Sequence, residues 1–269
     1  MDLLRPAPTG ADIPTTSDVP DTSNVRIPQY SRRAILAIWA AAAIPMAVLA
    51  WIVAPRWAAA SGGEEPFARS LILWLTIGLI WQFVLVLILV RVEQRSLRWS
   101  TLREALWLRS PRSPRTGRTG GRLWLLLIPL VLAFGAEGVL PSPSHPASRD
   151  FGRFLESDAG QTFLSGAWGW FGVILVLLVF NTVLGEELLF RGFLLPRMNG
   201  AFGRGDWVAN GVLFAVYHLH TPWVILSTLL DALILSYPTK RYRSAWIGII
   251  VHSVQSVVIA LVVLASVLR

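Results

Sequence analysis

The stretch "LVFNTVLGEELLFRGFLLP", residues 178–196, places three charged side chains inside an otherwise apolar run. An ionised side chain at the centre of a bilayer costs about 2.5–3.5 kcal/mol on insertion scales, so these charges need partners or a function. On a helix, Glu187 and Arg191 stand four residues apart with the acid first, the favourable order for an ion pair. Glu186 points roughly 100° away from that pair. The pattern predicts a structural Glu187–Arg191 pair and a Glu186 available for chemistry; the alternative is that all three reach the headgroups at a helix end.

The rest of the chain is typical of a membrane protein. Of its 269 residues, 54% are hydrophobic and 15% are charged, which is too apolar for a soluble domain of this length. We expect an all-α, polytopic bundle of seven transmembrane helices, because a helical span needs about 20 apolar residues. The expected spans are residues 34–54, 71–90, 123–140, 168–190 and 246–268, with two shorter ones at 207–220 and 223–236. Residues 31–166 would supply N-terminal membrane helices, and residues 167–269 a C-terminal membrane core that contains the charged stretch.

Arginine is distributed unevenly between the loops. Residues 91–122 hold nine arginines against two glutamates, whereas residues 55–70 hold two of each. Basic loops face the cytoplasm, so we expect the loop 91–122 and the N-terminus to be cytoplasmic. Residues 1–30, rich in Pro, Ser, Thr and Asp, would form a disordered cytoplasmic tail. The net charge of +8 therefore indicates orientation in a membrane and not nucleic-acid binding.

Part of the basic loop has a helical pattern. In "LRWSTLREALWLRS", residues 97–110, apolar side chains recur on one face and arginines on another. We expect an amphipathic helix in the membrane interface, with Leu102, Leu106 and Trp107 toward lipid and the arginines toward headgroups.

Two histidines within apolar segments are candidates to join Glu186. His218 lies in "VLFAVYHLH" and His252 in "IGIIVHSVQS". At about 1.5 Å per residue, both histidines and Glu186 would lie roughly 8 to 18 Å below the cytoplasmic face, so modest helix tilts could bring them together. His220 should face the opposite side of its helix from His218 and stay outside the site. For each histidine, the alternative is a hydrogen-bonded packing role.

The other polar candidates are less closely tied to this site. Gln255 and Ser256 follow the last-span histidine at i+3 and i+4, so we expect both on its face as hydrogen-bond donors. Asp231 is an acid within an apolar run and has either a packing or a supporting role. Glu137 lies near an outer helix end, and His145 lies in the proline-rich loop "PSPSHPAS". We expect an interfacial Glu137 and a solvated His145.

These residue types can hydrolyse a peptide bond. A glutamate withdrawn from water is a stronger base for activating a water molecule, and His218 can share the proton transfers. Donors must also meet the oxyanion that develops on the scissile carbonyl. The chain has no cysteine and no His-Glu-x-x-His sequence, which excludes a thiolate nucleophile and the common zinc-protease helix. Glu186, His218 and His252 could instead bind a metal such as zinc, although the scheme we favour requires no cofactor.

Two segments together resemble a known family. "GEELLFRG" is similar to the Glu-Glu-x-x-x-Arg motif of the CAAX prenyl endopeptidases and their bacterial relatives, the CPBP (Abi) intramembrane proteases. "FAVYH" is similar to the Phe-x-x-x-His motif of the same family. The resemblance covers about residues 168–260, and the N-terminal half matches only as hydrophobic spans.

The resemblance implies roles for individual residues. Glu186 and His218 would hold and activate the attacking water, and His252 would help to stabilise the oxyanion. The family usually has an asparagine four residues after that last histidine, where this chain has Ser256. A hydroxyl donates a hydrogen bond but reaches less far than an amide, so Ser256, or Gln255 in its stead, would be the second donor.

The sequence therefore favours an intramembrane endopeptidase of the CPBP type with its site facing the cytoplasm. Its partners would be membrane lipids and a membrane-associated protein or peptide substrate, and not nucleic acid. One lysine against 23 arginines suggests a GC-rich bacterial genome, hence the bacterial cytoplasmic membrane. Two alternatives stay open: a non-catalytic membrane binding or immunity protein of the same fold, and a proton-coupled transporter that uses Glu186 and the histidines as a relay.

Overall fold

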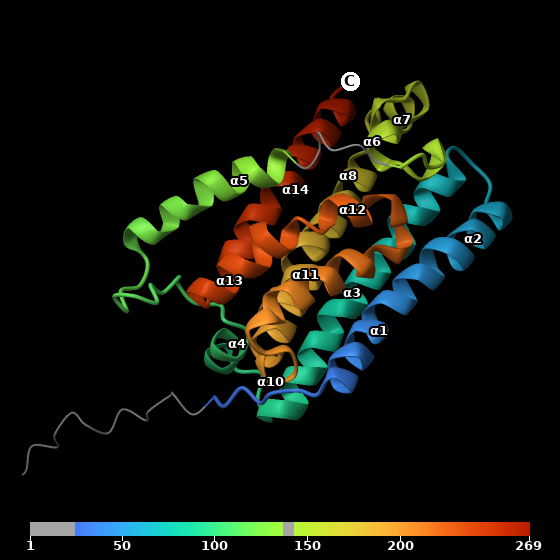
Figure 1. The fold of residues 1–269 in the computed structure, drawn as a ribbon. Helices are drawn as coiled ribbons and strands as arrows, with labels where there is room; N and C mark the ends of the chain where they lie inside the picture. Colours follow the sequence, from blue (N-terminus) through green and yellow to red (C-terminus); the bar gives the residue numbers. More distant parts are fainter. Residues whose placement is uncertain (1–24, 137–142) are drawn as a thin grey trace, which may run out of the picture.

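The structure is a computed structural model that describes residues 25–136 and 143–269. Over these residues the chain forms helices, turns and loops, and the only β pairing is an isolated bridge between Arg112 and Thr119. The expected all-α bundle is confirmed, and its long helices run roughly alongside one another (Figure 1). Glu137 and most of the predicted N-terminal tail lie outside the described residues.

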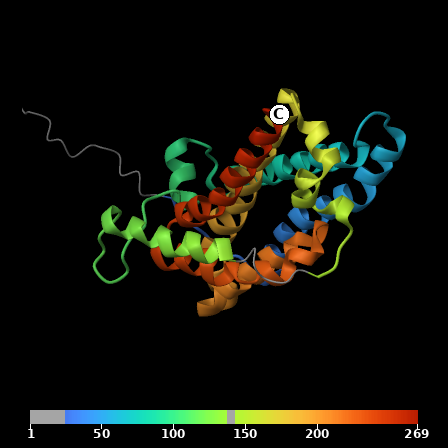
Figure 2. The same cartoon turned by 90° about the horizontal axis from the view of Figure 1, so that it is seen from above.

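The N-terminal half supplies the first two long helices. Its helices are α1 (Arg32–Val48), α2 (Ala54–Ala60), α3 (Pro66–Gln94), α4 (Trp99–Ala105) and α5 (Leu127–Gly135). A π-helical turn, Leu49–Val53, joins α1 to α2, whose second residue is Pro55. Both α1 and α2 pack against α3. In Figures 1 and 2, α5 lies at the edge of the bundle beside α14.

The C-terminal half contains the segments singled out in the sequence. Its helices are α6 (Phe151–Glu156), α7 (Asp158–Leu164), α8 (Trp168–Val179), α9 (Leu195–Arg197), α10 (Asn199–Phe202), α11 (Asp206–Tyr217), α12 (Ile225–Thr228), α13 (Tyr237–Tyr242) and α14 (Ala245–Val267). Two π-helical segments, Phe180–Gly185 and Leu188–Leu194, continue α8 into α9. Residues 168–197 are thus one long helix, with Glu186 and Glu187 between its π-helical segments.

Fewer helices could cross a membrane than the seven expected. Among the described residues, four are long and apolar enough: Arg32–Ala60, Pro66–Gln94, Trp168–Arg197 and Ala245–Val267. The pair Pro222–Thr228 and Ala232–Tyr242, bent by 49°, would add a fifth. The apolar stretch around α11 is only 12 residues long as a helix, and the helix ending in α5 has 15 described residues. Together with the exposed apolar side chains of these helices, the spans are those of an integral membrane protein.

The segment before α1 is ordered, unlike the tail predicted to extend to residue 30. The backbone N–H of Tyr30 donates to the carbonyl of Arg197, 3.0 Å away. The Gln29 amide donates to the Pro196 carbonyl and accepts from the Gly200 N–H. Composition alone indicated a disordered tail up to residue 30. It cannot show that a polar side chain such as Gln29 will form hydrogen bonds with backbone groups at a helix end elsewhere in the chain.

The amphipathic helix predicted in residues 97–110 is the shorter α4, and its apolar side chains and those that directly follow it meet the protein. Leu106 is buried in the main core, and Leu102 and Trp107 pack against the same cluster. The assignment of this face to lipid was wrong. Amphipathicity identifies an apolar face without indicating whether lipid or another helix covers it.

Candidate active site

The two glutamates lie where the helix is locally widened. They separate the π-helical segments Phe180–Gly185 and Leu188–Leu194, a kind of irregularity that is frequent at functional sites. Gly185 permits close contact with α3, since a Cβ there would lie 3.3 Å from the Leu79 carbonyl oxygen. Both glutamates are almost fully buried. The local structure therefore holds two carboxyl groups inside the bundle.

Glu187 connects two helices through one oxygen atom. Its Oε1 accepts from Nη1 of Arg191 at 3.0 Å and lies 3.1 Å from Nδ1 of His252 on α14. Gly248 makes room for this contact, because a Cβ at that position would overlap Oε2 of Glu187. The structure thus adds His252 to the ion pair foreseen within the helix. Glu187, and not Glu186, is the carboxylate that contacts this histidine.

Arg191 is also held by an aromatic ring. Its guanidinium carbon lies 3.9 Å from the centroid of the Phe214 ring, a cation–π contact. Nε and Nη2 of Arg191 have no hydrogen-bond partner within the described part of the chain. Phe214, the first residue of the "FAVYH" segment, therefore supports the charge that stabilises Glu187.

Both candidate histidines direct the same ring nitrogen at an oxygen. Nδ1 of His218 lies 3.0 Å from the Phe214 carbonyl, and Nδ1 of His252 lies 3.1 Å from the Glu187 carboxylate. A carbonyl or carboxylate oxygen only accepts, so Nδ1 carries the proton in each ring. The Phe214 ring packs between them, with centroids 5.0 Å from His218 and 6.1 Å from His252. With Nδ1 protonated, Nε2 is an acceptor in the neutral ring and a donor in the doubly protonated ring.

Glu186 has a different set of neighbours, which the sequence did not reveal. The Gln82 amide of α3 donates to the Tyr217 hydroxyl at 2.6 Å. That hydroxyl is also a hydrogen-bond partner of the Glu186 carboxyl. Asp231 interacts with Glu186 electrostatically and is buried. Two signals were available in the sequence: a single amide within the apolar span 71–90, and a tyrosine directly before His218.

The two proposed oxyanion donors lie in different places. Ser256 is buried, and its hydroxyl donates to Thr182 Oγ1 at 3.3 Å. Gln255 is exposed on the outside of α14. Residue i+4 is turned by about 40° from residue i, whereas residue i+3 is turned by about 60° in the other direction, which here faces outward. The structure brings Ser256 to the histidine's side of the helix and does not bring Gln255 there.

His220 lies beside His218 and not opposite it, as the helical spacing had suggested. α11 ends at Tyr217, and residues 218–220 form a tighter 3₁₀ turn. The two rings stack with centroids 5.5 Å apart. His145, expected to be solvated, pairs with Asp150 at the other end of the bundle. Helical periodicity failed for His220 because the helix ends before that residue.

The described side chains do not form the suggested metal site. No group of three His, Cys, Asp or Glu side chains in residues 25–136 and 143–269 is arranged to hold one ion. Nδ1 of His218 and of His252 face oxygens and Nε2 of each ring stays open, an arrangement that metal-binding histidines also have. Metal binding by Glu186, His218 and His252 therefore stays an untested prediction.

The comparison with protein families matches the part of the chain that contains these residues. Residues 168–258 match the Rce1-like family model, described as type II CAAX prenyl endopeptidase Rce1-like. This segment is an Rce1-like domain. It runs from the start of α8 into α14, so it holds Glu186, His218, His252 and Ser256, but not Gln82. The family resemblance inferred from the two motifs is confirmed.

The Rce1-like domain relates this segment to the CAAX-type intramembrane proteases. The N-terminal half lies outside the matched segment. No curated protein and no solved structure gave a match.

Proposed function

We propose that this protein is an intramembrane endopeptidase in which Glu186 activates water for attack on a peptide carbonyl. The observation that carries the proposal is the arrangement inside the Rce1-like domain. The buried Glu187 contacts His252, and the adjacent buried Glu186 contacts Tyr217, the residue before His218. Each histidine has Nδ1 facing an oxygen and Nε2 open. Such a site can accept, hold and return a proton while it is shielded from bulk water.

The proposed reaction divides the roles between the residues. The water oxygen adds to the carbonyl carbon while its proton passes to Glu186. His218 then helps to deliver that proton to the leaving amine, so the peptide C–N bond breaks without net change in charge. His252, oriented by Glu187 and Arg191, donates to the developing oxyanion from Nε2 when protonated. Ser256 is less suited to be the second oxyanion donor, because its hydroxyl already donates to Thr182.

The substrate would be a membrane-associated protein or peptide, with the site reached from the side of the basic loop. Comparative proteomics of membrane peptides, from cells with the wild type and with Glu186→Ala, tests the proposal. We expect a small set of peptides to be cleaved only in the presence of the wild type. The same cleavage by detergent-purified protein would tie the activity to this chain.

Metal independence belongs to the same proposal. We expect purified wild-type protein to keep its activity in the presence of a chelator. Reversible loss of activity that is restored by zinc would overturn the water-activation scheme and make Glu186, His218 and His252 metal ligands.

The two rival functions predict other outcomes. A binding or immunity protein of this fold would leave the membrane peptides unchanged when Glu186 is replaced. A proton-coupled transporter would move solute into vesicles in response to a pH gradient, and that flux would depend on Glu186.

A further inference from the structure

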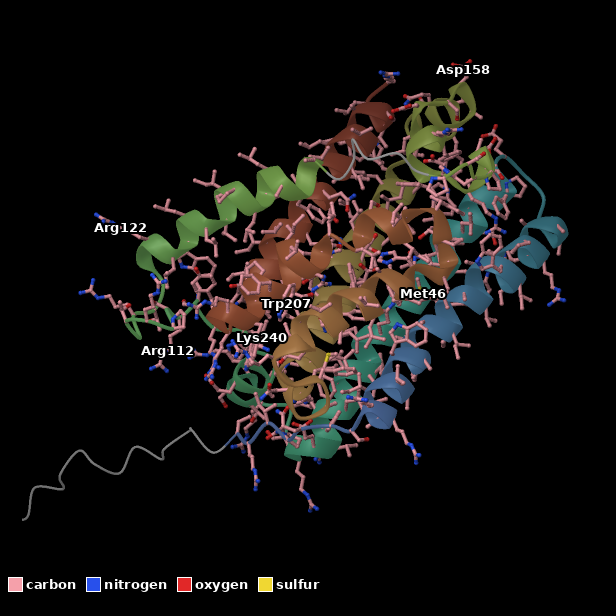
Figure 3. All side chains as sticks on the ribbon, viewed as in Figure 1. Met46, Arg112, Arg122, Asp158, Trp207 and Lys240 are labelled. Atoms are coloured by element: carbon pink, nitrogen blue, oxygen red, sulfur yellow. The ribbon has the colours of Figure 1, made fainter. Side chains whose placement is uncertain are left out.

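A second polar site lies away from the glutamates, at the end of the bundle that carries the basic loop. A cavity of about 480 Å³ opens between α4, the loop after it and the start of α14. Its charged lining residues are Arg103, Glu104, Arg109, Arg112 and Arg243. Four arginines thus face one glutamate. Figure 3 shows Arg112 in the loop before α5, with Asp158 at the far end of the molecule.

The walls of this arginine cavity are tied together by hydrogen bonds. The backbone N–H of Arg112 donates to the Tyr242 carbonyl at 2.9 Å, and the N–H of Ala245 donates to the Trp107 carbonyl at 2.9 Å. The Ser244 hydroxyl donates to the Arg109 carbonyl at 2.6 Å. The loop is therefore fastened to the turn between α13 and α14, so the cavity is a built feature of the fold.

Positive charge in the cavity exceeds what the protein neutralises. Glu104 lies 3.1 Å from Nη1 of Arg109 and 3.7 Å from Nε of Arg103. Arg112 and Arg243 have no carboxylate within ion-pair distance in the part of the chain that the structure describes. Burial lowers the pKa of Arg109; Glu104 opposes this shift, and the positive charges of Arg243 and Arg112 add to it. An anion bound here would relieve that repulsion.

The surface next to the cavity indicates where such an anion comes from. The basic loop leads through Gly121–Leu126 into α5. On this segment Leu125, Ile128 and Leu132 are 60%, 60% and 71% exposed, as expected for side chains that contact acyl chains. A phosphate group attached to acyl chains could enter the cavity while its chains lie along α5. A free phosphate would make no use of this apolar surface.

We propose that the arginine cavity binds the phosphate of an anionic phospholipid headgroup, with Arg112 and Arg243 as its main ligands and the acyl chains against α5. Guanidinium groups are well suited to phosphate because their N–H donors match its oxygens in pairs. Basic pockets at one membrane surface are known to hold anionic lipid headgroups. The bound lipid would brace the start of α14, the helix that carries His252 six residues beyond Trp246.

The test uses the full chain, purified in a mild detergent and stripped of lipid. Native mass spectrometry would measure the binding of dioleoylphosphatidylglycerol, with dioleoylphosphatidylcholine as the zwitterionic comparison. The site variant is Arg112→Gln with Arg243→Asn, since Asn tolerates the positive φ of 50° at residue 243. The matched control is Arg115→Gln with Arg118→Gln, which removes two exposed arginines of the same loop that do not line the cavity.

We expect the site variant to bind the anionic lipid about tenfold more weakly or worse, and the control to stay within about twofold of the wild type. The side chain of Arg112 makes no hydrogen bond within the described residues, so the single variant Arg112→Gln should show part of this loss in lipid binding with an unchanged unfolding temperature. Equal weakening in the site and control variants would overturn the proposal. Displacement of the lipid by millimolar inorganic phosphate would also overturn it, in favour of a soluble phosphate ligand.

Discussion

At the scale of single residues, Glu187 has two tasks where the sequence suggested one. The spacing to Arg191 predicts an ion pair within one helix, and the atoms lie 3.0 Å apart. The same oxygen also faces His252, which is 65 residues further along the chain. No pattern within one helix can predict that contact, since it depends on how α14 packs. Glu187 therefore stabilises the bundle and orients a histidine at once.

This double role separates the two glutamates experimentally. Glu186→Gln keeps the volume of the side chain and a partner for the Tyr217 hydroxyl, so we expect cleavage to be abolished and the unfolding temperature to be nearly unchanged. Glu187→Ala leaves the buried Arg191 without its carboxylate, which costs on the order of 3–5 kcal/mol, so we expect low folded yield as well as low activity. Activity assays and thermal unfolding in detergent measure both effects.

The control for this comparison is a double-mutant cycle. Arg191→Ala alone should lower the yield as Glu187→Ala does, and the two together should cost less than the sum of the single effects. Wild-type activity in Glu186→Gln would remove that residue from the role of base.

A second prediction concerns the donors that follow His252. Because Ser256 is buried near the site and Gln255 is exposed, Gln255→Ala should leave activity unchanged. If Ser256 assists the oxyanion, Ser256→Ala should lower kcat by up to about 10²-fold, as the loss of one such donor does elsewhere. Ser256→Asn, which restores the usual residue of the family, should keep or raise activity. The opposite ranking of the two alanine variants would reject the assignment.

At the scale of the elements, the end of α3 is fastened to α9 by an ion pair that the sequence did not predict. Nε and Nη2 of Arg197 lie 2.8 Å from Oε2 and Oε1 of Glu93, and Arg197 is completely buried. The Tyr30 hydroxyl donates to Glu93 Oε2 at 2.9 Å. In the sequence Glu93 was counted only as one of the two glutamates of the basic loop 91–122. Charge counting failed here because the partners are 104 residues apart.

Replacing one partner of this pair should destabilise the fold. Glu93→Gln would leave the Arg197 guanidinium buried without a counter-charge, so we expect the free energy of unfolding to fall by about 3–5 kcal/mol. Arg115→Gln, at an exposed position, should change it by less than about 0.5 kcal/mol. Thermal or denaturant unfolding of both variants in the same detergent measures the difference. Equal stability of the two would show that the pair contributes nothing.

The loop before α6 makes a pH-dependent contact with the segment after α11. Nδ1 and Nε2 of His145 face the Pro143 carbonyl at 2.9 Å and the Asp150 carboxylate at 2.8 Å, and the ring stacks on Trp223 at 4.7 Å. Both oxygens only accept, so the doubly protonated imidazolium fits best. The hydrogen bonds to Pro143 and then to Asp150 raise the pKa of His145 above its ordinary 6.5.

The sign of the pH effect follows from this raised pKa. The stabilisation by protonated His145 is fully present below about pH 6.5 and is lost as the pH rises through the pKa of the folded state. We expect His145→Ala to lower the unfolding temperature more at about pH 6 than at about pH 8.5. Asp150, whose pKa is lowered by His145 and the Arg153 N–H against the effect of burial, stays ionised at both values. If His145→Ala lowers the unfolding temperature by the same amount at both pH values, the protonated His145–Asp150 pair is contradicted.

At the scale of the whole molecule, apolar length predicted the bundle but not the number of its spans. Four expected spans coincide with long helices, the last of which ends one residue earlier than expected: 34–54, 71–90, 168–190 and 246–268. The apolar stretch at 207–220 ends in a 3₁₀ turn over residues 218–220, and the stretch at 223–236 is interrupted by a 49° bend at residues 229–231. Mean hydropathy is an average over many residues, so it does not detect such breaks. For the same reason it does not predict the π-helical segments around the glutamates.

Orientation in the membrane is the last prediction, and the chain suits its test because it contains no cysteine. The basic loop meets the start of α14, whereas the loop at 143–150 meets the other end of the bundle, where Arg149 lies over the Trp51 and Phe67 rings. The arginine excess of residues 91–122 predicts that the basic loop faces the cytoplasm. A cysteine at Arg115 should therefore resist a membrane-impermeant thiol reagent in intact cells, while one at Ser144 should be labelled. Both positions are exposed, so permeabilised cells should label both and control for access. Labelling of Arg115→Cys alone in intact cells would reverse the orientation and place the arginine cavity on the outer surface.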